Sequence, residues 1–110
     1  MTLLFYIGRS TIHGKGVLAK QDIVKGTFID SAIVIKSLLS ELVNYEITQH
    51  FGKYLNHSKR NANIVLKYKN RIFYAVANKH IKKDSEILID YDGPTIPFFI
   101  EGSKPHYKDN

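Results

Sequence analysis

The sequence predicts a mostly β single domain with one short helix. Several short runs are rich in β-branched and aromatic residues, turn residues separate these runs, and one segment alone has helical spacing. A chain of 110 residues, 44% of them hydrophobic, suits one domain with its own core. We expect residues 1–93 to form the core of this domain. Residues 94–110 would form a tail or lid, with Phe98 and Phe99 as its apolar part.

Three strands and a helix are predicted in the first half of the chain. Residues 1–7 are apolar but too short for a signal peptide or membrane span, so they predict a first strand. Residues 17–24 predict a second strand, and the β-branched run 27–35 a third after a Lys-Gly turn. Ser37 can cap a helix that reaches Phe51, because the apolar residues at 38, 39, 42 and 43 recur at helical spacing.

The second half predicts a hairpin and a closing strand. Residues 64–68 and 71–77 are β-type runs separated by Lys69-Asn70, and Asn tolerates positive φ in such a turn. A polar connection follows over 78–85. Residues 86–91 predict another strand, which ends at Asp-Gly-Pro.

Composition narrows the classes of site. No cysteine is present, which excludes a disulfide framework and a thiolate site and suits a reducing compartment. With no export signal recognised, we expect an intracellular protein, cytoplasmic or in a host nucleus if viral, without membrane contact. The five histidines are scattered and match no zinc or iron pattern, so we predict no metal.

The net charge of +6 is unevenly distributed. Residues 47–83 contain no acidic side chain, and acidic residues reappear from position 84 to 92. The basic residues of this block are Lys53, Lys59, Arg60, Lys67, Lys69, Arg71, Lys79, Lys82 and Lys83. Solvated hairpin surfaces explain the block, and contact with nucleic acid or another polyanion is the functional alternative.

Two polar motifs lie between apolar segments. In the first, two glycines flank Lys15, and glycines let backbone amides approach a ligand without side chains in the way. The second is Asn56-His57-Ser58, whose Asn side chain offers two donors and an acceptor. Ordinary turns explain either motif as well, and Asn-x-Ser is also a glycosylation acceptor in exported proteins.

Tyr91 is the third feature. It ends the predicted strand 86–91 and has aspartates on both sides. A tyrosine in such a position is either a hydrogen-bonding catalytic group or a core residue with a satisfied hydroxyl. No Ser/His/Asp order or phosphate loop accompanies it.

In this order and spacing, the three features resemble the SET domain of protein lysine methyltransferases. Residues 12–26 resemble the opening motif of that family, residues 54–58 its Asn-His-Ser motif, and residues 75–91 its closing motif. The resemblance extends from about Ile7 to Gly93. The ordered set is more specific than any one motif.

The resemblance implies a fold, a cofactor and a set of binding residues. The fold would be a β-clip whose C-terminal pseudoknot brings residues 56–58 beside the closing tyrosine. The methyl donor would be S-adenosylmethionine. Its methionyl end would lie against the backbone around Lys15 and Gly16, and Asn56 with the His57 backbone would hold the adenine and neighbouring groups.

The resemblance also implies a reaction. Tyr91 would sit where the donor methyl meets the incoming lysine amine, as the catalytic residue of a protein-lysine N-methyltransferase. The lysine would enter a narrow, partly aromatic channel, and Tyr45 is our candidate for its wall. The substrate would be a lysine on another protein, such as a histone, a ribosomal protein or a DNA-associated protein.

One departure from the family falls directly after Ser58. The family usually continues with Cys-x-Pro-Asn, and here Ala62 stands where that Asn is expected, unless Asn61 or Asn63 replaces it. Two alternatives therefore stay open: a catalytically weak SET-fold binding module, and a basic nucleic-acid-binding β-protein. The sequence leaves the oligomeric state open, a homodimer included.

Overall fold

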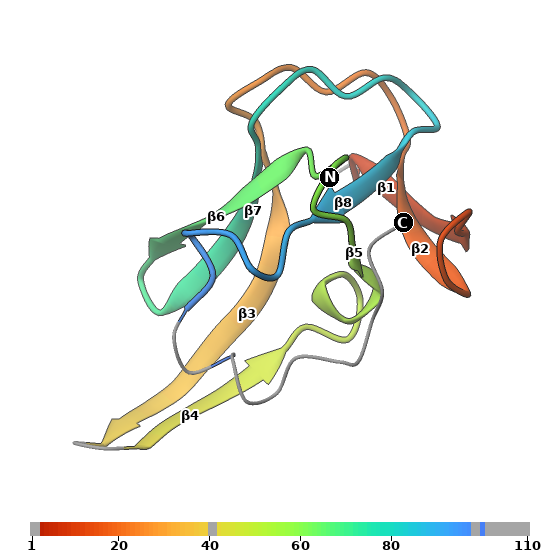
Figure 1. Ribbon diagram of the computed structural model, residues 1–110. Coiled ribbons are helices and arrows are strands. Elements are labelled where there is room, and N and C mark those ends of the chain that lie inside the picture. The colour runs from red at the N-terminus through yellow and green to blue at the C-terminus, as the bar shows by residue number, and fades with distance from the viewer. Residues whose placement is uncertain (1–2, 40–41, 98–99, 101–110) are drawn as a thin grey trace.

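The computed structural model describes residues 3–39, 42–97 and 100, and almost all regular structure in these ranges is β (Figure 1). The helical element whose bounds are described is the 3-10 turn η1 (Gly52–Tyr54). The strands are β1 (Phe5–Arg9), β2 (Lys15–Ala19), β3 (Phe28–Leu39), β4 (Leu42–Ile47), β5 (Asn56–His57), β6 (Ile64–Lys69), β7 (Ile72–Ala77) and β8 (Glu86–Ile89). The predicted mostly β fold class is confirmed.

The strands form two four-stranded sheets. One sheet has the order β1-β2-β8-β5, with antiparallel pairs except for the parallel pair of β5 and β8. The other has the order β4-β3-β7-β6 and is antiparallel throughout. In Figure 1 β3, β4, β6 and β7 lie on one side of the molecule, and β1 and β2 lie on the other. Side chains from both sheets, among them Val17, Ile87, Ile33 and Ala75, share one buried core.

The helix predicted over residues 37–51 is wrong. The structure continues β3 to Leu39 and pairs it with β4, and η1 begins after this range, at Gly52. From Val43 to Ile47 half-buried residues alternate with exposed ones, which is the period of a strand and not of a helix. The apolar residues at 38, 39, 42 and 43 fit helical spacing, but the alternation that follows them is that of a strand.

The other local predictions hold with shifted ends. The first strand starts at Phe5, and β2 ends at Ala19, after which Ile23 makes an isolated bridge to Ile81. The hairpin of β6 and β7 is confirmed, with Asn70 at φ 50° in its turn. No helix in the described ranges has the length and apolarity needed to cross a membrane.

The parallel pair of β5 and β8 brings together segments about 30 residues apart. Asn56 lies opposite Leu88 and His57 opposite Ile89, and Ser58 N donates to Ile89 O at 3.0 Å. This confirms the expected approach of residues 56–58 to the closing strand. The predicted pseudoknot extends into the C-terminal tail, where residues 98–99, the phenylalanines of the expected lid, and 101–110 lie outside the described residues.

Candidate active site

Tyr91 is held from two directions immediately after β8. Its backbone N–H donates to His57 Nδ1 at 3.1 Å, and its ring lies 6.0 Å from the imidazole ring with an angle of 17° between their planes. Its hydroxyl donates to Leu55 O at 3.1 Å. Because β5 and β8 are paired, both partners of Tyr91 come from the segment that runs alongside it.

Burial favours the neutral form of the Tyr91 side chain. It raises the pKa of the Tyr91 phenol, so the hydroxyl is neutral and able to donate at physiological pH. Tyr91 also lines a narrow pocket whose other described walls are largely apolar. These walls include Gly52, Leu55, Ile89 and Ile96. The pocket has a volume of about 20 Å³, roughly the space of one water molecule, so a long aliphatic chain enters it only when its walls move apart.

A second group of residues fixes the loop before β2. Asn56 Nδ2 lies 3.0 Å from His13 O, 3.1 Å from Lys15 O and 2.9 Å from Glu86 Oε2. Ser10 Oγ donates to the same carboxylate, at 2.8 Å to Oε1 and 2.9 Å to Oε2. Glu86 therefore joins β8 to both the loop and β5.

Gly16 leaves the space that the side chains of this junction occupy. A Cβ at this position would clash with Glu86 Oε2 and crowd Asn56 Nδ2. The predicted residues Gly16 and Asn56 are thus neighbours, as the resemblance implies. The Nδ2 group of Asn56 bonds within the protein, which gives this side chain a structural task beside its predicted contact with a ligand.

An open groove adjoins the loop. It has a volume of about 590 Å³ and is lined by Ile7, Gly8, Arg9, Gly14, Lys15 and Tyr54. Small-molecule sites commonly occupy about 300–1,000 Å³. Two cationic side chains and an aromatic ring suit a ligand with a carboxylate and a flat apolar part. Lys15 was predicted here from the sequence, whereas Arg9 and Tyr54 were not.

Of the two asparagines beside Ala62, Asn63 is the one that contacts β8. It is buried, its Nδ2 donates to Glu86 O at 2.9 Å, and its Oδ1 accepts from Leu88 N at 2.9 Å. Its backbone N–H donates to Leu88 O at 3.0 Å. Asn61, by contrast, is exposed and its N–H donates to Ser58 Oγ. Asn63 is therefore the residue that supports β8.

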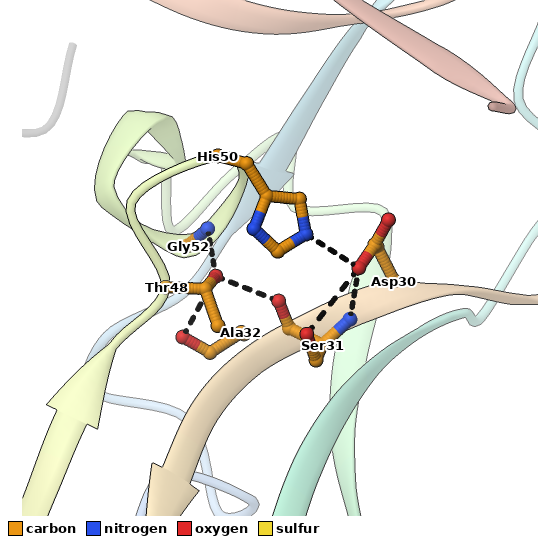
Figure 2. Close-up of polar contacts among 6 residues, drawn as sticks. All are labelled: Asp30, Ser31, Ala32, Thr48, His50 and Gly52. Carbon is orange, nitrogen blue, oxygen red and sulfur yellow. Dashed lines mark hydrogen bonds and ion pairs between the residues drawn. The ribbon is translucent and has the colours of Figure 1, made fainter.

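Another network positions the wall of the apolar pocket (Figure 2). Thr48 Oγ1 donates to Ser31 O at 2.7 Å and accepts from Gly52 N at 2.7 Å. A Cβ at Gly52 would clash with Ala32 O. His50 Nε2 lies 2.8 Å from Asp30 Oδ1, so a second contact ties the same turn to β3. Sequence reasoning missed this turn because it was included in the predicted helix.

Tyr45 lies apart from these features. It sits on β4 opposite Ile35 and packs against the core, and it is not among the described residues that line the apolar pocket. Its predicted role in a substrate channel stays a prediction.

An acidic group lies next to Tyr91. Ligand atoms of His57, Asp90 and Asp92 come within 4.8 Å of one another, and Asp92 N donates to Asp90 Oδ1 at 2.9 Å. His57 Nδ1 accepts the Tyr91 N–H bond, and we assign no metal to this group. Its carboxylates place negative charge beside the pocket, which favours a cationic partner.

Comparison with known families adds to this geometry. The family model described as the SET domain matches residues 39–92, a range that contains Asn56, His57 and Tyr91. A SET domain is therefore recognised in the chain over these residues. No curated protein sequence gives a match.

Solved structures share the SET fold at low identity. A candidate histone methyltransferase of Plasmodium falciparum matches with a TM-score of 0.62 and 23% identity, over 90% of this chain and 99% of that chain. The methyltransferase domain of human PR domain-containing protein 2 matches with a TM-score of 0.64 and 19% identity, over 89% and 83%. A chain of the Chaetomium thermophilum Polycomb Repressive Complex 2, as a humanized mutant, matches with a TM-score of 0.66 and 21% identity, over 92% of this chain and 16% of that chain.

Proposed function

We propose that this SET domain is a protein-lysine N-methyltransferase that uses S-adenosylmethionine. The observation that carries the proposal is the hydrogen bond from the Tyr91 hydroxyl to the Leu55 carbonyl, since both residues line a small apolar pocket. Support also comes from the Gly16–Asn56 junction, which lies on the strands next to β8. The SET-domain match and the methyltransferases among the structural neighbours support the proposal.

The groove beside the loop fits the proposed cofactor. The backbone of Lys15 and Gly16 would hold the methionyl end, and the guanidinium of Arg9 would pair with its carboxylate. Asn56 and the His57 backbone would hold the adenine and the groups next to it. When bound, S-adenosylmethionine supplies a methyl group from its sulfonium sulfur, and that sulfur becomes a neutral thioether.

The pocket residues prepare the lysine amine. A free lysine has a pKa of about 10.4, and an apolar pocket disfavours its charged form, so entry promotes loss of the proton to solvent. The Leu55 carbonyl can accept an N–H of the amine, and the neutral Tyr91 hydroxyl can orient it further. Methyl transfer is an in-line displacement, so alignment is the contribution that these groups make to the rate.

The substrate is a lysine on another protein. Asp90 and Asp92 lie beside Tyr91 and attract a basic segment, which offsets the positive charge of the chain locally. Histones, ribosomal proteins and DNA-associated proteins present such segments and are the proposed substrate classes.

Titration calorimetry with S-adenosylmethionine tests cofactor binding. We expect micromolar affinity, and we expect Arg9→Gln to weaken it about tenfold because a charge-assisted hydrogen bond is lost. Arg60→Gln is the matched control, since Arg60 is exposed on the turn after Ser58. The absence of binding at about millimolar ligand, where a specific site would be filled, overturns the proposal.

A further inference from the structure

The sheet of β4, β3, β7 and β6 has one face turned away from the core. On β7, Phe73, Ala75 and Ala77 face the core, so Ile72 and Tyr74 face outward, because side chains alternate along a strand. Lys67 lies opposite Tyr74 and Lys69 opposite Ile72 on β6, so both lysines share the outward side. We call the side formed by Phe28, Lys67, Lys69, Ile72 and Tyr74 the outer sheet face.

Two aromatic rings are adjacent on the outer sheet face. Phe28 is 49% exposed, and its ring centroid lies 5.7 Å from that of Tyr74 with an angle of 59° between the planes. Phe28 lies opposite Val76, which is 1% exposed and does not belong to the main core cluster. The aromatic pair therefore covers a small apolar patch and presents ring surface to the solvent.

The charge around this pair is positive. Lys67 and Lys69 are exposed, and Arg71 is exposed in the adjoining turn. The two carboxylates on the strands of this sheet are engaged: Glu46 lies 3.8 Å from Lys36, and Asp30 lies 2.8 Å from His50 (Figure 2).

The basic block of residues 47–83 is divided by β7. Arg71 precedes this strand and Lys79 follows it, and six extended residues separate the two ends by about 20 Å. Lys82 and Lys83 lie beyond Lys79, toward the start of β8. Lys67 lies opposite Tyr74, whereas Phe28 lies opposite Val76, toward the Lys79 end of β7. The block therefore does not act as one uniform patch.

We propose that the outer sheet face binds single-stranded nucleic acid. Lys67, Lys69 and Arg71 would contact phosphates, and an unpaired base would stack on the pair of Phe28 and Tyr74. The combination of ring surface and flanking cations favours this partner over an acidic protein, which would need the charge alone. The inference does not depend on methyl transfer, because none of these residues belongs to the candidate active site.

Fluorescence anisotropy with a labelled oligothymidylate of about 12 nucleotides tests the proposal. With about three phosphate contacts, we expect the logarithm of the association constant to fall against the logarithm of salt concentration with a slope of about −2. Lys67→Glu combined with Lys69→Glu should weaken binding at least about tenfold and flatten the slope. Lys82→Glu combined with Lys83→Glu is the charge-matched control and should change binding less than about threefold.

A second pair of variants tests stacking. Phe28→Tyr keeps the ring and should bind as the wild type does, whereas Phe28→Leu keeps apolar bulk without the ring and should bind about tenfold more weakly. Circular dichroism confirms that each variant is folded. Any one of four results overturns the proposal: no binding at low salt, equal losses in the two lysine double variants, equal binding of duplex DNA, or equal binding of polyglutamate.

Discussion

Tyr91 has the contacts that a lysine methyltransferase needs at the reacting end of its pocket. His57 fixes its backbone, and Leu55 O accepts from its hydroxyl. The arrangement leaves a carbonyl and a neutral hydroxyl side by side. These groups orient an amine without competing for its proton, because the pKa of the phenol is raised by burial.

The raised pKa of Tyr91 predicts a loss of stability in alkali. The unfolded chain ionises this phenol near its ordinary value of 10.0, before the folded chain does. Above that pH the unfolded state therefore binds fewer protons, and the free energy of unfolding falls as the pH rises through the folded pKa. Tyr91→Phe should show a smaller fall between about pH 8 and pH 11 in urea denaturation.

Tyr68→Phe is the control for this comparison, because it removes a phenol from an exposed site. If Tyr91→Phe and the wild type lose the same free energy over this pH range, burial does not hold the phenol neutral.

Glu86 should position the cofactor loop without touching the reacting atoms. Its carboxylate accepts hydrogen bonds from Ser10 and Asn56. In Glu86→Gln an amide NH₂ group faces one of these donors, so one hydrogen bond is lost. We expect the Kd for S-adenosylmethionine to rise about tenfold, which corresponds to about 1.4 kcal/mol, while kcat at saturating cofactor stays near the wild-type value. Glu46→Gln, on the exposed side of β4, should leave the Kd unchanged. A fall in kcat alone would assign Glu86 a different role.

Among the elements, the turn between β4 and η1 links the sheet to the site. Thr48 connects the backbone of β3 to Gly52, and Gly52 O accepts from Leu55 N at 3.2 Å. Leu55 O in turn accepts from Tyr91. A continuous series of hydrogen bonds therefore runs from β3 to the hydroxyl of the candidate catalytic tyrosine.

Thr48→Ala should destabilise the protein by about 1–3 kcal/mol, because it leaves the buried Gly52 N–H without its partner. Thr48→Ser keeps the hydroxyl and should lose less than about 1 kcal/mol. The free energies of unfolding in urea give both values. Equal losses in the two variants would show that the Thr48 methyl group, and not the hydrogen bond, carries the stability.

The hairpins show which elements the sequence can predict. The turn of β6 and β7 was predicted because Asn70, which adopts positive φ, lies between two β-type runs. The hairpin of β3 and β4 differs from the predicted helix, since the apolar residues at 38, 39, 42 and 43 have helical spacing. The strand β3 also pairs with β7, a contact between distant segments that the local pattern does not contain.

In the molecule as a whole, β8 is the strand that assembles the site. It pairs with β2 and β5, and Asn63 bonds to it through both its side chain and its backbone. Tyr91, Asn56 and Gly16 were found in the sequence through the resemblance to the SET family. The hydrogen bonds of Glu86, Thr48 and Asn63 that hold the site could not be predicted from the sequence. They arise from contacts between segments that are distant in sequence or from local turns.

Asn63→Ala tests this assembly. It leaves the buried N–H of Leu88 and the carbonyl of Glu86 without their partners, which should cost about 2 kcal/mol or more. Asn61→Ala changes an exposed side chain two residues away and should cost less than about 0.5 kcal/mol. Urea denaturation measures both, and similar small losses would show that Asn63 does not support β8.

Transfer of a labelled methyl group from S-adenosylmethionine to histone and ribosomal fractions tests the central claim most directly. We expect the wild-type chain to label lysine. Tyr91→Phe should reduce the rate at saturating cofactor about 100-fold or more, while binding S-adenosylmethionine with unchanged affinity. A Tyr91→Phe variant that methylates at the wild-type rate would contradict the assignment of Tyr91, and a wild-type chain that binds the cofactor but labels no lysine would contradict the proposed activity.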